Sequence, residues 1–336
     1  MREVGGYALA AMDVLILLVS LVVVTVGAEA LVRGASALAL RARLSPLFVG
    51  LTIVGFGTST PELGASVTAT LAGSSDMSVG NVVGSNVFNI GVILGSSALL
   101  RPIQVQLGAV RRDLIVALAA ALALLLTPAF GGVVPRAGGI VLVGALAVYL
   151  TYAFRAARRA PRAETALAGE ELRDALHVGG GPEPLLGAGK SAALVLFGLV
   201  CLVVGSRWFV GAALDIARAA GISELVIGLT VVSAGTSLPE LVTSLVAARR
   251  GSADIAVGNV IGSNIFNVLG ILGIAAILGP QSVSASVLAL DVPVLIVATL
   301  ALVPILRSGG RISRVEGGVL CAGYALYLAA QLVRGG

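Results

Sequence analysis

Two acidic residues lie deep in apolar sequence, each in a copy of the same short motif. Glu62 ends the stretch GFGTSTPE, residues 55–62, and Glu240 ends SAGTSLPE, residues 233–240. Each stretch combines glycine, hydroxyl side chains and a proline with one carboxylate. Proline lacks a backbone N–H and clashes with the preceding helical turn, so we expect a helix to break just before each glutamate. The expected product is a cluster of carbonyl, hydroxyl and carboxylate oxygens.

Oxygen clusters of this kind bind hard cations, and Ca²⁺ takes about six to eight oxygen ligands from carboxylates, carbonyls and water. One motif does not supply that number, whereas two facing motifs do. Two carboxylates neutralise one Ca²⁺ or two Na⁺, and a third Na⁺ would make transport carry net charge. The structural alternative is that Glu62 and Glu240 are hydrogen-bonded between helices. Two symmetric positions beside broken backbone favour the ion site, because an unpartnered carboxylate inside a membrane is costly.

The following apolar segment carries a second repeated motif, which reads GNVVGSNVFN at 80–89 and GNVIGSNIFN at 258–267. Its serine and last asparagine are four residues apart and therefore share a helix face. These residues are Ser85, Asn89, Ser263 and Asn267. We expect them to complete the coordination with neutral oxygens; the alternatives are close packing for the serines and interhelical hydrogen bonding for the asparagines. Asn86 and Asn264 point to other faces and are interpreted as structural.

Composition predicts the elements that position these residues. The chain has 336 residues, of which 57% are hydrophobic and 12% are charged, and its mean hydropathy is +1.04. Apolar runs of about 18 residues or more can each cross a bilayer as a helix, so we predict an all-α polytopic membrane protein with ten transmembrane helices. The predicted spans are 12–34, 46–71, 79–99, 110–128, 132–154, 191–214, 223–247, 255–279, 287–306 and 316–333.

The ten spans form two halves of five, 1–154 and 191–336, joined by the hydrophilic connection 155–190. Residues 45–95 align without a gap on residues 223–273 at a shift of 178, with 29 identities in 51 positions. An odd number of spans per half makes the two copies run in opposite directions. Inverted repeats of this kind are typical of secondary transporters, whose binding site lies near the membrane midplane where the copies meet.

Basic residues predict the orientation. Loops after the odd-numbered spans hold 17 of the 22 Lys and Arg residues, and the opposite side holds 5. By the positive-inside rule the connection 155–190 is cytoplasmic and both termini lie outside. The absence of a signal or transit segment and the compact loops predict a prokaryotic inner membrane. In the first span, the spacing of Glu29 and Arg33 favours a helical ion pair, with an ion-path role as the alternative.

With both motifs in view, the chain resembles the Ca²⁺/cation antiporter superfamily, and within it the prokaryotic sodium/calcium exchangers. GTSTPE and GTSLPE, each followed by G-S-N-[VI]-F-N, are similar to the two alpha-repeats of that family. The resemblance covers most of the chain and implies that spans 1 and 6 slide past the core to alternate access. It also implies the ion ligands Thr58, Ser59, Glu62, Ser85, Asn89, Thr236, Ser237, Glu240, Ser263 and Asn267, with the backbone carbonyls of Gly55 and Ser233.

The sequence departs from some relatives at two places. Potassium-dependent exchangers have Asp in the second repeat where this chain has Asn267, so K⁺ coupling is not expected. Gly55 and Ser233 differ, so the two half-sites are not equivalent. Proton-coupled members typically show a GNxxE-type motif in place of GTSxPE, which favours Na⁺ as the coupling ion.

The leading interpretation is therefore a Na⁺/Ca²⁺ antiporter, and the alternative is Ca²⁺/H⁺ exchange through protonation of Glu62 and Glu240. A channel is disfavoured by the inverted repeat around one site. An intramembrane protease is disfavoured because no HExxH motif occurs and the one histidine, His177, lies in the polar connection. We expect no enzyme activity, no cofactor beyond the transported Na⁺ and Ca²⁺, and no nucleic-acid partner; the lipid bilayer is the expected surrounding.

Overall fold

The computed structural model describes residues 2–105, 107–159, 186–220, 233–307 and 309–335, and it is largely α-helical. Within these residues, eight helices are long and apolar enough to cross a membrane. They are Met12–Ala42, Ser75–Leu100, Leu107–Phe130, Arg136–Arg159, Ala188–Ala219, Ala253–Leu278, Val287–Arg307 and Arg314–Arg334. They coincide with eight of the ten predicted spans, which confirms a helical chain with many membrane-crossing segments.

The helical elements follow one another closely along the chain. They are α1 (Arg2–Ala42), α2 (Pro46–Val49), η1 (Gly50–Val54), α3 (Gly55–Thr58), α4 (Thr60–Leu71), α5 (Ser75–Phe88), η2 (Asn89–Leu94), α6 (Gly95–Leu100), α7 (Leu107–Ala123), η3 (Leu124–Phe130), α8 (Arg136–Arg159), α10 (Ala188–Ala219), α12 (Ser233–Thr236), α13 (Leu238–Arg250), α14 (Ala253–Ile265), η5 (Phe266–Leu272), α15 (Gly273–Leu278), η6 (Val287–Asp291), α16 (Val292–Arg307) and α17 (Arg314–Gly335).

The remaining two predicted spans are the ones that carry the glutamate motifs, and each is interrupted. In the first, the helix stops at Ser59, whose backbone (φ −78°, ψ 11°) leaves the helical region between α3 and α4. In the second, Ser237 (φ −87°, ψ 10°) separates α12 from α13 in the same way. Both breaks precede the proline, as predicted. Residues 223–232, the start of the seventh predicted span, lie outside the described residues.

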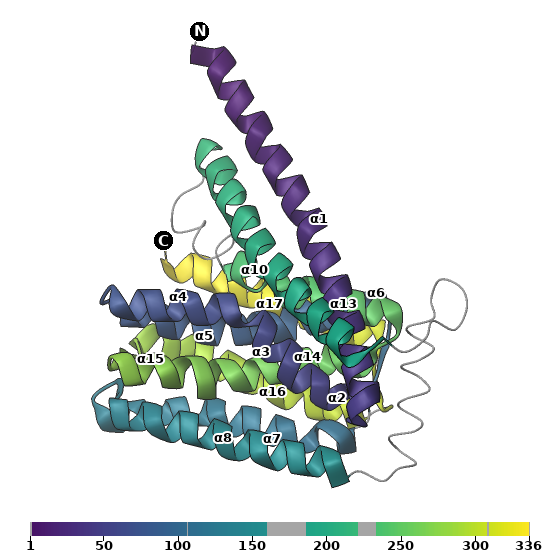
Figure 1. Cartoon of the computed structure of the whole chain (residues 1–336). Coiled ribbons are helices and arrows are strands. Elements are labelled where there is room, and N and C mark those ends of the chain that lie inside the picture. The colour runs from purple at the N-terminus through teal and green to yellow at the C-terminus, as the bar shows by residue number, and fades with distance from the viewer. Residues whose placement is uncertain (1, 106, 160–185, 221–232, 308, 336) are drawn as a thin grey trace.

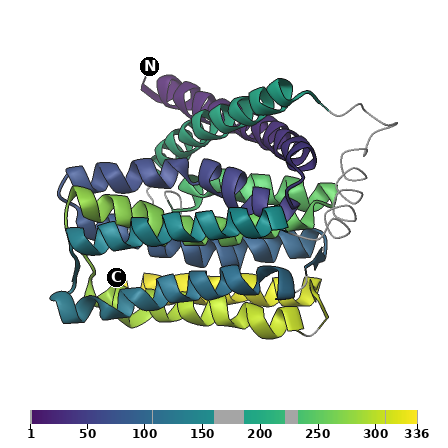
Figure 2. The ribbon, with the colours of Figure 1, turned by 60° about the horizontal axis from the view of Figure 1, so that its bottom comes forward.

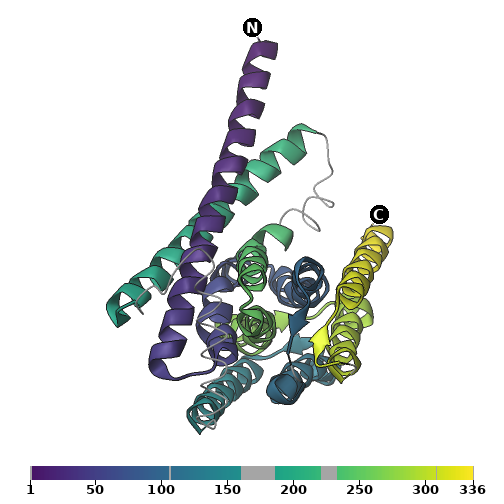
Figure 3. The same ribbon diagram turned by 90° about the vertical axis from the view of Figure 1, so that its right-hand side faces the viewer.

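Two long helices stand apart from the others. Figures 1, 2 and 3 show α1 and α10 crossing each other on one side of a bundle of roughly parallel helices, with α17 on the opposite side. Glycine permits the crossing, since a Cβ on Gly198 would lie 2.6 Å from the carbonyl oxygen of Gly27. Small residues at helix interfaces allow such close approach in lipid, where packing replaces the hydrophobic effect.

The helices that carry the second motif form the centre of the bundle. Buried residues make up 78% of the most apolar window in Ser75–Leu100 and 83% in Ala253–Leu278, compared with at most 39% in the other six spans. Gly262 of α14 packs so tightly on the η1 segment that a Cβ there would lie 2.2 Å from the carbonyl oxygen of Leu51. The polar residues of both motifs are therefore enclosed by protein.

Two short antiparallel ribbons join the ends of the bundle. Strand β1 (Ile103–Gln104) pairs with β4 (Arg311–Ile312), and β2 (Val133–Val134) pairs with β3 (Gln281–Ser282). Each ribbon links one strand from each half of the sequence. Moreover, β3 lies 178 residues after β1 and β4 lies 178 residues after β2, which is the shift of the sequence repeat. The two ribbons are thus related by exchanging the halves.

Candidate functional site

The two motif glutamates lie together in the bundle interior. Glu62 and Glu240 are each 1% exposed and sit in the first turns of α4 and α13. Ser59 donates a hydrogen bond to Glu240 Oε1 (2.7 Å), and Ser237 donates one to Glu62 Oε1 (2.9 Å). Each half therefore holds the carboxylate of the other half with the serine at its helix break.

Neither carboxylate has a positive partner among the described residues. The ion pairs found there join Glu29 to arginines and do not involve Glu62 or Glu240. The described residues also contain no group of three or more His, Cys, Asp or Glu side chains placed to hold a metal ion. Buried charge without a partner is strongly unfavourable. The arrangement thus requires a cation, or protons, to balance two acids surrounded by neutral oxygens.

Hydroxyl groups extend the cluster onto α5 and α14. Ser237 Oγ lies 3.3 Å from Ser85 Oγ, and Ser263 donates a hydrogen bond to the backbone carbonyl of Gly55 (3.1 Å). Thr58 Oγ1 lies within hydrogen-bond distance of three acceptors, the carbonyls of Val54 and Gly55 and Oδ1 of Asn259. Five of the predicted site positions, Gly55, Thr58, Ser85, Ser237 and Ser263, are therefore joined in one buried network with the glutamates.

Asn89 and Asn267 bring amide groups to the same region, and each is 1% exposed. The side-chain nitrogen of Asn89 donates to Oδ1 of Asn264 (2.9 Å), and that of Asn267 donates to Oδ1 of Asn86 (2.9 Å). Asn86 and Asn264 also donate to each other's backbone carbonyls, at 3.1 and 3.3 Å. The two asparagines interpreted as structural thus join α5 to α14 across the halves.

Four buried oxygen atoms in this region have no hydrogen-bond donor. They are Glu62 Oε2, Glu240 Oε2, Asn89 Oδ1 and Asn267 Oδ1. Among the described residues, no other buried side-chain carboxylate or amide oxygen lacks a partner; the remaining unpaired atoms are four hydroxyls and one guanidinium nitrogen. Unpaired buried acceptors are rare and costly in folded proteins. Carboxylate and amide oxygens are the ligands that Na⁺ and Ca²⁺ prefer.

Two predicted ligands are placed less fully. Thr236 ends α12 and is half-buried. Ser233 begins α12, and its side chain lies outside the described part of the structure. Both residues belong to the helix that leads to the second break, as Gly55 and Thr58 lead to the first.

Sequence reasoning missed one pair of polar residues that supports the glutamates. Asn81 donates to the backbone carbonyl of Glu62 (3.3 Å) and to Ser66 Oγ (3.0 Å). Asn259 makes the same two contacts in the other half, to the carbonyl of Glu240 (3.2 Å) and to Ser244 Oγ (2.8 Å). Their signal was present in the sequence, because both are the Asn of the repeated GN dipeptide.

A second pair of buried acids lies outside the site. Tyr149 of α8 donates to Asp113 Oδ1 of α7 (2.9 Å), and Tyr327 of α17 donates to Asp291 Oδ1 (3.1 Å). Gln331 also donates to Asp291. The two acid–tyrosine pairs are 178 residues apart, beyond the segments whose repetition is visible in the sequence. They tie neighbouring helices together at positions that the motifs do not mark.

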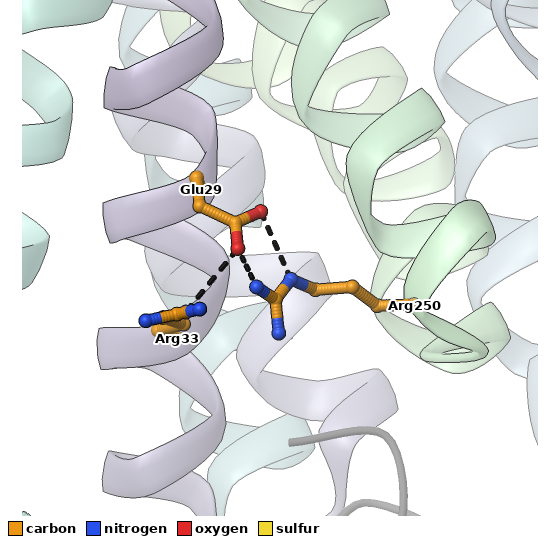
Figure 4. A network of polar contacts seen from close by, with 3 residues as sticks. All are labelled: Glu29, Arg33 and Arg250. Atoms are coloured by element: carbon orange, nitrogen blue, oxygen red, sulfur yellow. Dashed lines mark hydrogen bonds and ion pairs between the residues drawn. The ribbon is translucent and has the colours of Figure 1, made fainter. Parts of the chain in front are cut away.

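An ion-pair network connects α1 to α13 (Figure 4). Glu29 accepts a hydrogen bond from Arg250 Nε (2.9 Å) and forms an ion pair with Arg33 (3.2 Å). The expected pair within α1 is therefore present, and Arg250 is the partner that the sequence did not reveal. Since α13 begins beside Glu240, the network joins the crossing pair of helices to an element of the site.

Comparison with known proteins agrees with this architecture. The model of the sodium/calcium exchanger protein family matches residues 12–155 and 190–333. The chain belongs to this family. The match covers most of the sequence, in two segments that each contain one glutamate motif. Members of the family are membrane transporters, so the coarse expectation of a transporter is confirmed.

Individual relatives extend over nearly the whole chain. The putative antiporter CaxA of Alkalimonas amylolytica is 38% identical over 92% of this chain and 95% of its own length. The sodium/calcium exchanger MaX1 of Methanosarcina acetivorans is 35% identical over 94% and 97%. Inner membrane protein YrbG of Escherichia coli is 35% identical over 94% and 95%. A solved structure of the sodium–calcium exchanger NCX_Mj matches with a TM-score of 0.79 and 28% identity, over 95% of this chain and 98% of that one.

Proposed function

We propose that the chain is a secondary active antiporter that exchanges Na⁺ for Ca²⁺ by alternating access at one site with two carboxylates. The observation that carries the proposal is the set of four unpaired buried oxygens, two from carboxylates and two from amides. A bound cation would satisfy all four at once. One Ca²⁺ or two Na⁺ would balance Glu62 and Glu240, so the two loads compete for the same charge. Competition of this kind is what couples one ion's movement to the other's.

The remaining ligands would come from the hydroxyl and carbonyl groups around the glutamates. The proposed set is Gly55, Thr58, Ser59, Glu62, Ser85, Asn89, Ser233, Thr236, Ser237, Glu240, Ser263 and Asn267. Ca²⁺ needs about six to eight oxygens, and neutral groups supply them without adding negative charge. The absence of a third acid in the ligand set supports exchange of one Ca²⁺ for Na⁺ without K⁺.

The proposed architecture is ten transmembrane helices in two inverted repeats of five, with the domains 1–154 and 191–336. The exchange of strands between the ribbons supports it, because β1–β4 and β2–β3 are repeat-related and connect different spans. The excess of Lys and Arg places the connection 155–190 in the cytoplasm and both termini outside. A prokaryotic inner membrane is proposed, and the printed name of the relative YrbG supports that location.

The experiment is uptake of radioactive Ca²⁺ into proteoliposomes that contain the purified protein. Vesicles loaded with Na⁺ are diluted into Na⁺-free buffer, and a parallel set carries a pH gradient without Na⁺. Uptake driven by the Na⁺ gradient is expected, and its rate should respond to a membrane potential set with K⁺ and valinomycin if three Na⁺ move per Ca²⁺.

The parallel arm separates the alternatives. Uptake driven only by the pH gradient would replace Na⁺ by H⁺ as the coupling ion and retain the site. Vesicles with Glu62→Gln serve as the matched control, since the protein keeps its shape and loses one charge. Failure of both gradients to drive Ca²⁺ uptake would contradict the proposed function.

A further inference from the structure

We infer that Asn86 and Asn264 are positioning residues that hold the amides of Asn89 and Asn267 with oxygen, and not nitrogen, turned to the ions. The inference rests on the proposed function and concerns the same site. It assigns an ion-binding role to two residues whose sequence positions suggested only helix packing. All four asparagines are at most 5% exposed.

Backbone carbonyls determine the orientation of the whole set. The carbonyl of residue 86 can only accept, so the atom of Asn264 that faces it at 3.3 Å must be nitrogen. The other amide atom of Asn264 is therefore its oxygen, and it faces Asn89 at 2.9 Å. Asn89 must present nitrogen to that oxygen. Its own Oδ1 consequently turns away, and it is one of the four unpaired buried oxygens.

The same argument holds in the other half, starting from the carbonyl of residue 264. Asn86 donates to it at 3.1 Å, so Asn86 Oδ1 faces Asn267 and accepts from its nitrogen at 2.9 Å. Asn267 Oδ1 is then the atom left unpaired. The assignment of both amides follows from main-chain acceptors and not from a choice between nearly identical atoms.

The orientation matters because an amide is a cation ligand through its oxygen only. A rotated Asn89 or Asn267 would turn an NH₂ group, which carries positive partial charge, toward the ions and would remove a ligand. The arrangement also disfavours Asp at position 267. A carboxylate there would set an oxygen against Asn86 Oδ1, and two acceptors at that distance repel each other.

Asn86→Ala tests the inference on one half of the site. It frees Asn267 but leaves Asn264 held by the backbone carbonyl of residue 86, so Asn89 keeps its orientation. Removing an outer partner of a metal ligand typically lowers metal affinity about 10- to 100-fold. We expect the Ca²⁺ concentration for half-maximal uptake to rise about 10-fold, at the low end of that range, while the maximal rate stays close to that of the wild type. Asn264→Ala should act equally through Asn89.

A double-mutant cycle separates positioning from packing. Combining Asn86→Ala with Asn267→Ala should raise the half-maximal Ca²⁺ concentration no further than Asn267→Ala alone, because residues that act through one another are not additive. Combining Asn86→Ala with Asn89→Ala should multiply the two effects. If both combinations multiply, Asn86 does not act through Asn267 and the inference is wrong.

Gln281→Ala is the matched control, because Gln281 is another fully buried amide and donates to the carbonyl of Ala275 (3.1 Å) outside the site. It should lower the thermal unfolding temperature without changing the half-maximal Ca²⁺ concentration. Asn86→Ser is the second variant should Asn86→Ala not fold, and Ca²⁺-dependent thermal stabilisation in detergent reads binding without transport. Unchanged Ca²⁺ affinity in folded variants, with wild-type uptake intact, would overturn the inference alone. Absence of wild-type uptake would instead contradict the proposed function.

Discussion

The site and the crossing helices obey the sequence repeat to different degrees. In the site, the contacts recur after 178 residues and are exchanged between halves, as in Ser59 with Glu240 and Ser237 with Glu62. In the crossing pair, the position equivalent to Glu29 of α1 is Arg207 of α10, and the position equivalent to Arg250 is Ala72. The ion pair between α1 and α13 consequently has no repeat-related counterpart.

The difference separates two tasks. Ion coordination near a pseudo-symmetric centre needs the same donors from both halves, so substitutions on either side would be equally damaging. The crossing helices lie against the bundle and contribute none of the four unpaired oxygens. Contacts that they make with one half only add free energy to the conformation in which they form. The symmetric region thus determines what is bound, and the asymmetric one weights the conformations between which a transporter alternates.

The largest effect is expected from removing either carboxylate. Glu62→Gln and Glu240→Gln each take one of two charges from the site, and each should weaken Ca²⁺ binding more than about 100-fold, since these are direct ligands and outer partners already contribute 10- to 100-fold. Calorimetric titration of the detergent-solubilised protein with Ca²⁺ measures this, and thermal unfolding without ions checks that both variants fold. Retained Ca²⁺ binding in one of the two would show that the halves are not equivalent.

A second effect should be confined to the crossing helices. Gly198→Leu places a side chain against the Gly27 carbonyl and should separate α1 from α10. Overpacking of this kind costs about 1–3 kcal/mol or more. Gly211→Leu is the matched control on the same helix, because a Cβ there meets nothing within 4 Å. Cross-linking of cysteine pairs placed along α1 and α10 measures the separation. Equal cross-linking in both variants would mean that the close contact is dispensable.

The sequence predicted the repeated features of this molecule well and the unrepeated ones poorly. Proline and hydroxyl residues predicted both helix breaks, because their effect on a helix is local. The partner of Glu29 was not predictable, since Arg250 is 221 residues away and its counterpart, Ala72, has no charge. The roles of Asn86 and Asn264 were also hidden. Helix periodicity places them on another face, and only the crossing of α5 and α14 brings that face to Asn89 and Asn267.

A smaller effect is expected from the α1–α13 ion pair. The side chain of Glu29 is 35% exposed and that of Arg250 is 11% exposed, and partly exposed pairs contribute about 0.2–1 kcal/mol. Glu29→Gln should therefore change the conformational equilibrium by no more than about fivefold. The half-maximal Ca²⁺ concentrations measured from the two sides of the membrane, in vesicles of opposite orientation, should move in opposite directions. Arg33→Gln is the control, since Arg33 contacts Glu29 within α1 only. Movement in the same direction would assign the pair to the ion path.

The smallest effect should come from the acid–tyrosine pairs, where symmetry returns without ion binding. Tyr149→Phe and Tyr327→Phe each remove one buried hydrogen bond to an aspartate, and interhelical hydrogen bonds in membranes average about 0.6 kcal/mol. Both variants should unfold at slightly lower temperature and transport Ca²⁺ with unchanged half-maximal concentration. Tyr152→Phe, on the same helix as Tyr149 and 49% exposed, is the control. A changed Ca²⁺ dependence in both variants would extend the symmetric functional region from the site to the ends of α7 and α16.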